Sequence, residues 1–522
     1  MKRFEAGAAF LIFSVSLTLY LRTLAPSLLY GDSAEFQTIA FTLGLGHPTG
    51  YPVYILLAKL FTFLPVGDIA YRVNLLSAVA GALTVSLVYL ILRKLGALQI
   101  PAVLSVFFLA FAELFWKHAS IAEIYTVSSA CLAFIFYSLL AWKESHDPRW
   151  LFAAGLVGGL SLGIHTTVAL SAIAIFIYLL LSFFFPLSSG DQRGKKKEYF
   201  ADIKAGATGA LLGFAIFLSS FLFLDNLNAS ASYYNTVVRH ALSIWGMTPA
   251  DFDSPFERLA FLYFPPQFSG QFFAVSNELI LERLLEFFSG VSWMVVIAAA
   301  GIVSLFIIRK DLTSRWREAV LLMVAFFTFL FFAVSYDVYD YYVFYIPAVL
   351  IFVIAVGMGF SAINEALSSI SILPKFIPAG FVAVLILASL WFLFPNTLSA
   401  LESRIPPFTD DYEAMLFTSP EMRLMEAEQV LDAIEDNAII FTDWDTAYNF
   451  YYAAHVLQGR TEMAFHETYP QEGVRELAES TLAYIAGNID ARPIYFTERP
   501  SELAVLYQIQ RTGSGLFRLV KK

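Results

Sequence analysis

Long apolar stretches separated by short polar segments dominate the first 395 residues of the chain. A helix needs about 20 apolar residues to cross a hydrocarbon layer about 30 Å thick. Hydropathy predicts about eleven such helices, at residues 6–22, 73–92, 100–115, 121–141, 150–164, 166–186, 205–224, 291–308, 319–335, 342–360 and 377–395. The pattern therefore predicts an all-α polytopic membrane protein.

Residues 396–522 follow a different pattern. Helix-like and strand-like runs alternate there, at residues 438–442, 447–456, 474–485, 493–497 and 516–520. Such alternation in short runs is typical of a small α/β domain in water. We therefore expect two domains, a transmembrane domain of residues 1–395 and a soluble α/β domain of residues 396–522.

The composition agrees with one domain in lipid and one in water. The 522 residues are 58% hydrophobic and only 15% charged, with 52 Phe and 26 Tyr, whereas an average soluble domain is about 25% charged. The whole net charge of −10 lies in residues 396–522. The single cysteine, Cys131, falls in an apolar run, so an intrachain disulfide or a cysteine metal cluster is excluded.

Basic residues are unequally divided between the loops. Most Lys and Arg of the first 395 residues fall in alternate loops, beginning with Lys2 and Arg3 and including the run at 195–197. The positive-inside rule therefore predicts a cytoplasmic N-terminus and an extracytoplasmic C-terminal domain. The two long loops, residues 23–72 and 225–290, would also lie outside. The apolar stretch 53–64 is too short to span and suits an interfacial or re-entrant helix.

Polar residues gather at the predicted outer ends of the spans. An ionisable side chain costs roughly 2.5 to 3.5 kcal/mol at the bilayer centre, so such residues are mostly kept for a role. The candidates are Asp32, Glu35, His47, His118, Glu123, His165, Arg239, His240, Asp337 and Asp340. None falls in the middle of a span and no internal repeat is visible, which argues against a secondary transporter.

The segment GDSAEF, residues 31–36, places Asp32 and Glu35 on one face of a helix. One interpretation is a capping box, with Asp32 as N-cap and Glu35 three positions on, opening a helix that runs to Leu43. The other makes Asp32 a general base, ionised at neutral pH because the pKa of an ordinary Asp is about 3.9. The two interpretations are compatible.

The next motif, HPTGYP at residues 47–52, contains His47 and Tyr51. Gly50 allows unusual backbone angles and two prolines stiffen the turn, which predicts a shaped turn beside Asp32. His47 is either a polar turn residue or a substrate ligand.

Similar alternatives hold further along the chain. Glu123 and His165 are either polar residues at the membrane interface or substrate ligands. In YDVYDYYVFYIP, residues 336–347, an aromatic belt explains the tyrosines but does not explain Asp337 and Asp340.

The segments YGDSAEFQTIAFTLGLGHPTGYPVY, WKHASIAEIYT, GLSLGIH, RHALSIWGMTP, YDVYDYYVFYIP and FTDWDTAYNFYYAAHVLQGR follow one another along nearly the full chain. In this order they resemble a transmembrane O-mannosyltransferase family of the GT-C glycosyltransferase superfamily. That family usually reads Asp-Ser-Gly-Glu-Phe and His-Pro-Pro-Gly where this chain has Ala34 and Thr49. Both carboxylates are kept.

The resemblance implies a GT-C-like fold and an inverting membrane glycosyltransferase. It would move a hexose, with mannose expected, from a polyprenyl-phosphate sugar to a hydroxyl, with protein Ser/Thr as the expected acceptor and a glycan as the alternative. Asp32 would be the catalytic base and Glu35 the second catalytic carboxylate, while Arg239 would hold the lipid-linked phosphate. The substrate-binding residues expected are His47, Tyr51, His118, Glu123, His165, Arg239, Asp337 and Asp340.

Cofactors and partners follow from the same residues. The seven His show no metal-ligand spacing, so we expect no metal, with a divalent ion as the alternative counter-charge for the phosphate. Besides donor and acceptor the partner is membrane lipid, and no nucleic acid is expected.

Other functions and roles stay open. The protein could be a carrier or flippase that moves a lipid-linked sugar without chemistry, or a non-catalytic scaffold. The C-terminal domain either selects the acceptor or is a structural module.

Overall fold

The structure is a computed structural model that describes residues 3–185, 192–307, 315–374, 376–471 and 473–522, without the side chains of residues 192–196. Lys2, Arg309, Lys310 and Lys375, which count among the predicted cytoplasmic basic residues, lie outside the described residues.

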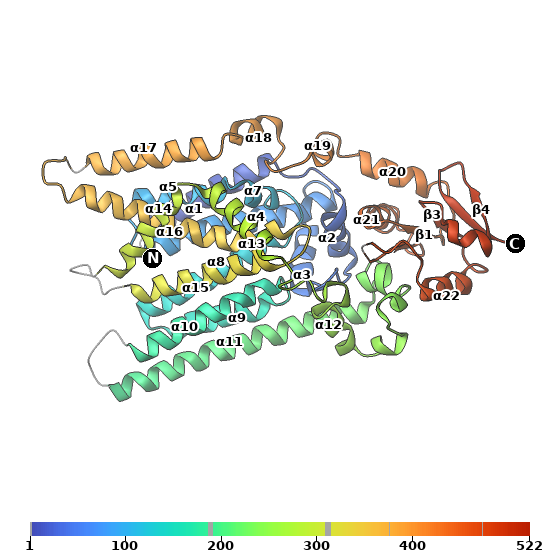
Figure 1. Ribbon diagram of the computed structural model, residues 1–522, viewed down its shortest axis with the longest axis horizontal. Coiled ribbons are helices and arrows are strands. Elements are labelled where there is room, and N and C mark those ends of the chain that lie inside the picture. The colour runs from blue at the N-terminus through green and yellow to red at the C-terminus, as the bar shows by residue number, and fades with distance from the viewer. Residues whose placement is uncertain (1–2, 186–191, 308–314, 375, 472) are drawn as a thin grey trace.

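Within the described residues, eight helical segments are long and apolar enough to cross a membrane, and they form one elongated bundle (Figure 1). They are α1 (Arg3–Arg22), α4 (Ile69–Lys94), α8 (Tyr125–Ser145), η1 with α10 (Thr166–Leu170 and Ser171–Phe184), α11 (Gln192–Leu227), α15 (Trp316–Ser335), η6 with α16 (Tyr341–Tyr345 and Ile346–Ser368) and α17 (Phe376–Leu393). A ninth results if α13 (Asn277–Val291) and α14 (Met294–Phe306), which are bent by 86°, form one span. The polytopic all-α class is confirmed, whereas the predicted number of eleven spans is not.

Two predicted spans differ from the structure. Residues 100–115 do not form one span, because the chain divides there into α5 (Gln99–Ser105), α6 (Phe107–Ala110) and α7 (Glu113–His118). The apolar run ends at Ala112 and Glu113 follows, so α7 forms a separate short helix. Residues 150–164 do form a helix, α9 (Pro148–Ser161), but its 14 residues fall short of the about 20 that a full crossing needs.

Helix α9 packs against α11 with the two backbones in direct contact. A Cβ atom added at Gly155 would lie 2.0 Å from the Gly206 carbonyl oxygen, and one at Gly209 would lie 2.1 Å from that of Phe152. Small residues at such crossings let membrane helices associate without a hydrophobic driving force. The contact fixes the turn after α9, whose Gly163 carbonyl accepts a hydrogen bond from the Val53 N–H over 2.9 Å.

Both predicted long outer loops contain helices. Loop 23–72 forms α2 (Gly31–Thr42) and α3 (Pro52–Thr62), so the short apolar helix expected near 53–64 is present. Loop 225–290 forms α12 (Pro255–Tyr263). It also contains four single-turn helices, η2 (Tyr234–Val238), η3 (Leu242–Trp245), η4 (Pro249–Phe252) and η5 (Pro266–Phe268). Together they cover one end of the bundle.

The chain then runs through α18 (Thr397–Ser403), α19 (Asp411–Thr418) and α20 (Met422–Leu431) into a five-stranded sheet of order β2-β1-β3-β5-β4. Its strands are β1 (Ile439–Thr442), β2 (Ala464–Glu467), β3 (Ile494–Phe496), β4 (Tyr507–Arg511) and β5 (Phe517–Lys521). β1 pairs in parallel with β2 and β3, while β5 is antiparallel to β3 and β4. The accompanying helices are α21 (Trp444–Tyr451), η7 (Tyr452–Leu457), α22 (Glu479–Asn488) and η8 (Ser501–Val505). The expected small α/β fold is confirmed.

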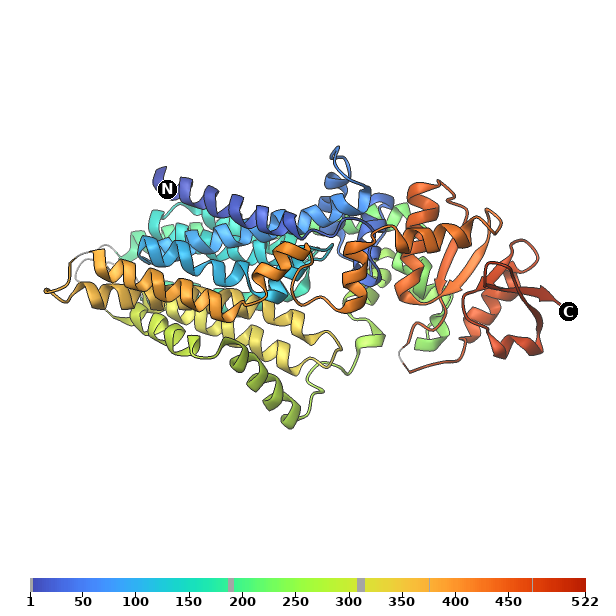
Figure 2. The same ribbon diagram turned by 90° about the horizontal axis from the view of Figure 1, so that it is seen from above.

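The start of α1 and the C-terminal sheet lie at opposite ends of the molecule (Figures 1 and 2). Arg93 pairs with Glu5 near the start of α1, over 3.4 Å. This arrangement is compatible with the predicted orientation, in which the basic end is cytoplasmic, and that orientation stays a prediction.

Candidate functional site

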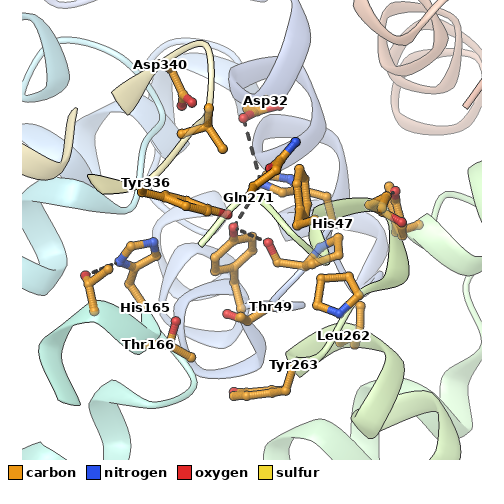
Figure 3. A pocket seen from close by; sticks show the side chains of 18 of the residues that line it. Asp32, His47, Thr49, His165, Thr166, Leu262, Tyr263, Gln271, Tyr336 and Asp340 are labelled. Carbon is orange, nitrogen blue, oxygen red and sulfur yellow. Dashed lines mark hydrogen bonds and ion pairs between the residues drawn. The ribbon is translucent and has the colours of Figure 1, made fainter. Parts of the chain in front are cut away.

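A cavity of about 970 Å³ opens where the end of the bundle nearest the C-terminal domain, loop 225–290 and the C-terminal domain meet (Figure 3). Five of the predicted site residues line it, three from loop 23–72 and two from other segments: Asp32, His47, Tyr51, His165 and Asp340. The structure thus brings together side chains that are up to about three hundred residues apart in sequence.

Asp32 lies in the first turn of α2, but it does not cap the helix. The helix begins at Gly31, with Tyr30 in the N-cap position and no side-chain cap hydrogen bond. Gly31 has φ +55°, a left-handed conformation that glycine adopts without steric cost, and the helix starts two residues earlier than expected, with Tyr30 and not Asp32 as its N-cap. The predicted capping box is therefore wrong, because the side chain of Glu35 turns into the protein instead.

Glu35 is fully buried and does not line the cavity. Its carboxylate accepts hydrogen bonds from the backbone N–H of His47 over 2.8 Å, from His47 Nδ1 over 2.5 Å and from the Tyr448 hydroxyl over 3.0 Å. A carboxylate with three donors is satisfied without substrate. Glu35 therefore contacts His47 from behind the cavity wall, and its catalytic role stays a prediction.

His47 joins the buried carboxylate to the cavity. Its Nε2 lies 2.9 Å from the Tyr51 hydroxyl, which donates to the Pro48 carbonyl over 2.8 Å, and 3.7 Å from Oδ2 of Asp32. Burial lowers the pKa of His47, but the carboxylates of Asp32 and Glu35 outweigh it and raise this pKa to about 10. No Lys or Arg is among the described residues that line the cavity, so the His47 imidazolium is its cation.

Asp32 is held from the opposite side by the C-terminal domain. The Nε1–H of Trp444 donates to Oδ1 of Asp32 over 3.0 Å, and the Asp32 side chain is 43% exposed. Asp340 approaches the same region of the cavity, on the side away from Tyr263 (Figure 3). Burial, followed by the charge of Asp32, raises the pKa of Asp340. A partly exposed carboxylate next to an imidazolium is suited to removing a proton from a hydroxyl.

His165 forms an inner part of the wall. Its Nδ1 lies 2.5 Å from the Thr167 hydroxyl, and its ring stacks on those of Tyr51 and Phe344 with centroids 6.4 and 6.0 Å apart. The hydrogen bond from Val53 N–H to the Gly163 carbonyl brings the turn that carries His165 next to the HPTGYP segment.

Four predicted substrate-binding residues do not line the cavity. His118 is buried, with Nδ1 2.8 Å from the Leu114 carbonyl oxygen. Asp337 is half exposed and pairs with Arg283 over 3.8 Å. Burial, followed by the charge of Asp32, raises the pKa of Glu123, which does not line the cavity, and Arg239 is exposed outside the cavity.

Sequence reasoning missed the contribution of the C-terminal domain. Trp444 and Glu467 line the main cavity and also a second one of about 290 Å³ within the C-terminal domain. Burial, helped by Asp443 and Asp445, raises the pKa of Glu467 to about 8. The segment FTDWDTAYNFYYAAHVLQGR, on which the family resemblance partly rests, contains Trp444 and was the available signal.

Aromatic side chains form the remaining wall, and among these the sequence pattern singled out only the segment 336–347, as an aromatic belt. They come from loop 225–290 and from the region of α15 and η6, and include Tyr263, Phe268, Phe272, Phe332, Tyr336 and Phe344. Across the described residues no group of three or more His, Cys, Asp or Glu side chains is arranged to hold a metal ion. Metal independence stays a prediction.

The helix arrangement is similar to that of a solved membrane protein. Over 98% of both chains the structure resembles ArnT from Cupriavidus metallidurans, solved bound to undecaprenyl phosphate, with a TM-score of 0.56 and 12% sequence identity. At that identity the likeness shows the fold alone, and the expected GT-C-like fold is confirmed.

Sequence relatives point to a particular family within this class. Residues 32–185 match the family model described as Protein O-mannosyl-transferase TMEM260 N-terminal domain. The chain is 30% identical over 174 residues to Protein O-mannosyl-transferase TMEM260 of Mus musculus, which is 32% of this chain and 25% of the mouse protein. It is 22% identical over 140 residues to Protein O-mannosyl-transferase tmem260 of Dictyostelium discoideum, 26% and 17% of the two chains. The match thus spans a quarter or less of these relatives, and the resemblance to the transmembrane O-mannosyltransferase family is confirmed over that part.

Proposed function

We propose that the protein is an integral-membrane, inverting glycosyltransferase that moves mannose from polyprenyl-phosphate mannose to a Ser or Thr hydroxyl of a protein. The observation that carries the proposal is the pairing of Asp32 with the His47 imidazolium in a large cavity at the end of a GT-C-like bundle. The names of the mouse and Dictyostelium relatives support mannose and protein, and the undecaprenyl phosphate of ArnT supports a polyprenyl donor.

In the proposed reaction Asp32 acts as the general base. Its carboxylate takes the proton of the acceptor hydroxyl while that oxygen attacks the anomeric carbon of the donor. The bond from the anomeric carbon to the phosphate oxygen breaks, and polyprenyl phosphate leaves with the electron pair. One displacement inverts the configuration, and a positioned base typically contributes ~10²- to 10⁴-fold in rate.

The His47 imidazolium offsets the charge that develops on the departing phosphate. Glu35 and the Tyr51 hydroxyl already hold its two ring nitrogens, so little rearrangement is needed when that charge appears. This is the role that sequence reasoning gave to Arg239, which lies outside the cavity.

The two substrates would approach from different sides. Apolar and aromatic side chains on the membrane side of the cavity, among them Leu262, Phe272 and Phe332, suit the lipid-linked donor. The smaller cavity beyond Trp444 gives the acceptor a route through the C-terminal domain. In the proposed orientation the active site is extracytoplasmic and the N-terminus cytoplasmic, as the basic loops predict.

The test is transfer by the purified full-length protein in liposomes. With undecaprenyl-phosphate [³H]mannose and a panel of Ser- and Thr-rich peptides, we expect label on the peptides that β-elimination releases. The same peptides with Ala in place of Ser and Thr are the control. Movement of the labelled lipid across the bilayer with no label on any peptide would support a flippase and overturn the proposal.

A further inference from the structure

Two helices from distant parts of the chain face each other beside the cavity. Helix α2 carries both predicted carboxylates, and helix α21 follows strand β1 in the C-terminal domain. The Trp444 Nε1–H donates to Asp32 Oδ1 over 3.0 Å, and one turn further along both helices the Tyr448 hydroxyl donates to Glu35 Oε1 over 3.0 Å. The spacings of three and four residues keep each pair on one helix face.

The contact continues into the backbone. The Thr38 hydroxyl donates to the carbonyl oxygen of Tyr448 over 3.2 Å, so the register of the two helices is fixed. Asp443 caps α21 by accepting the N–H of Thr446 over 3.0 Å. Both donors are therefore presented by an ordered helix.

The Trp444 ring has little freedom. It meets the rings of His47, Tyr233 and Tyr448 edge to face, with centroids 6.0, 5.8 and 5.2 Å apart. The indole N–H is a donor only, so it cannot accept or relay the proton of the reaction. What it can do is hold one oxygen of the partly exposed Asp32 carboxylate in a single orientation.

We propose that Trp444 and Tyr448 are positioning residues of the transferase site. Trp444 orients the Asp32 base and Tyr448 fixes the Glu35–His47 pair, so the C-terminal domain is part of the catalytic unit and not only a module that captures substrate or covers the site. This inference rests on the proposed function. Misplacing a reacting group by about 1 Å can cost ~10²-fold in rate.

The first test is W444F, which removes the N–H and keeps an aromatic ring. With undecaprenyl-phosphate mannose and a Ser/Thr peptide we expect kcat to fall about 10- to 10²-fold while the donor KM changes by less than about twofold. The matched control is W245F, because Trp245 Nε1 is buried and has no hydrogen-bond partner among the described residues. W245F should keep the wild-type kcat, and an equal kcat for W444F would overturn the inference.

A double-mutant comparison separates orientation of the base from a general structural effect. If Trp444 acts through Asp32, adding W444F to D32N should cause no further loss of residual activity. If the fold-loss of kcat in the double variant equals the product of the fold-losses in W444F and D32N, Trp444 acts elsewhere. Y448F should likewise lower kcat in the wild type and add nothing to H47Q.

Folding and function are kept apart by two further measurements. If W444F melts at a lower temperature than the wild type, the variant W444H, which keeps a ring N–H, is compared with it. Recovery of kcat in W444H supports orientation of Asp32 by the N–H. An equal loss of kcat in W444F and W444H refutes that orientation. Absence of transfer by the wild-type protein would defeat the proposed function itself, whereas transfer at the same rate by the wild type and W444F would defeat only the positioning role.

Discussion

The two walls of the cavity differ in kind. One wall consists of α2 and the turn at residues 46–51, and it carries Asp32 and His47 within a network of hydrogen bonds. The other consists of residues 262–272 with the end of α15 and residues 336–344, and it presents mainly aromatic rings such as those of Phe272 and Phe332. The charged wall is suited to chemistry and the aromatic wall to holding a lipid-linked sugar.

This contrast has a kinetic consequence. Groups whose interactions strengthen only in the transition state change kcat, whereas groups that bind substrate and transition state alike change KM. Substitutions in the charged wall should therefore lower kcat, and substitutions in the aromatic wall should raise the donor KM.

The largest effect is expected for Asp32→Asn. Loss of the ionised base should lower kcat ~10²- to 10⁴-fold, while α2 stays folded because Asp32 is not its cap. Steady-state transfer and a melting curve measure the two quantities. Asp337→Asn, which alters a carboxylate outside the cavity, should retain the wild-type rate. A D32N protein that transfers mannose normally would remove Asp32 as the base.

His47→Gln should lower kcat about 10- to 10²-fold, the equivalent of the ~1.5–3 kcal/mol of a hydrogen bond to a charged group. In the wild type the rate should fall as pH rises through about 10, where His47 loses its proton. The corresponding stabilisation of the fold is complete below the ordinary pKa of 6.5 and is lost as pH rises through about 10. A pH profile of kcat that is identical in H47Q and the wild type would contradict this role.

Phe272→Ala tests the aromatic wall. Phe272 lines the cavity and stacks on Tyr336 with ring centroids 4.7 Å apart, so its loss should raise the donor KM roughly 3- to 10-fold with little change in kcat. The neighbouring Phe273 stacks on Phe331 and does not line the cavity, which makes Phe273→Ala the matched control. Equal KM values for the two variants would argue against donor binding at this wall.

The smallest effect is expected for Arg239→Ala. Arg239 is exposed and outside the cavity, so the donor KM should stay within about twofold of the wild-type value. A large rise in KM would show that loop 225–290 closes over the donor and brings Arg239 to the phosphate.

The general fold could be predicted from sequence because the bilayer imposes a simple length and polarity on each crossing. The break between α6 and α7 could not, because the apolar run at residues 100–112 does not show where neighbouring helices let the chain turn. The C-terminal sheet was visible only as isolated runs, and the pairing of β1 with β2 and β3 depends on contacts between distant segments.

The site was predicted in part for a similar reason. The three-residue spacing of Asp32 and Glu35 fits a capping box as well as an active site. The structure decides between the two, because Glu35 is hydrogen-bonded to His47 and Tyr448 and not to the start of the helix. Trp444 approaches Asp32 across 412 positions of sequence, a contact that no local pattern records. Arg239 has a suitable charge, but the path of loop 225–290 takes it away from the cavity.

The hydrogen bond between Asp32 and Trp444 also bears on how the protein is made. At roughly 5–20 residues per second, a ribosome needs about 20 to 80 s to add the 412 residues that separate them. Throughout that interval α2 is already synthesised, but α21, the helix that packs against it, is not. The growing chain therefore enters the membrane before the site is complete, and a polypeptide from interrupted translation would lack the contacts of α21 with α2.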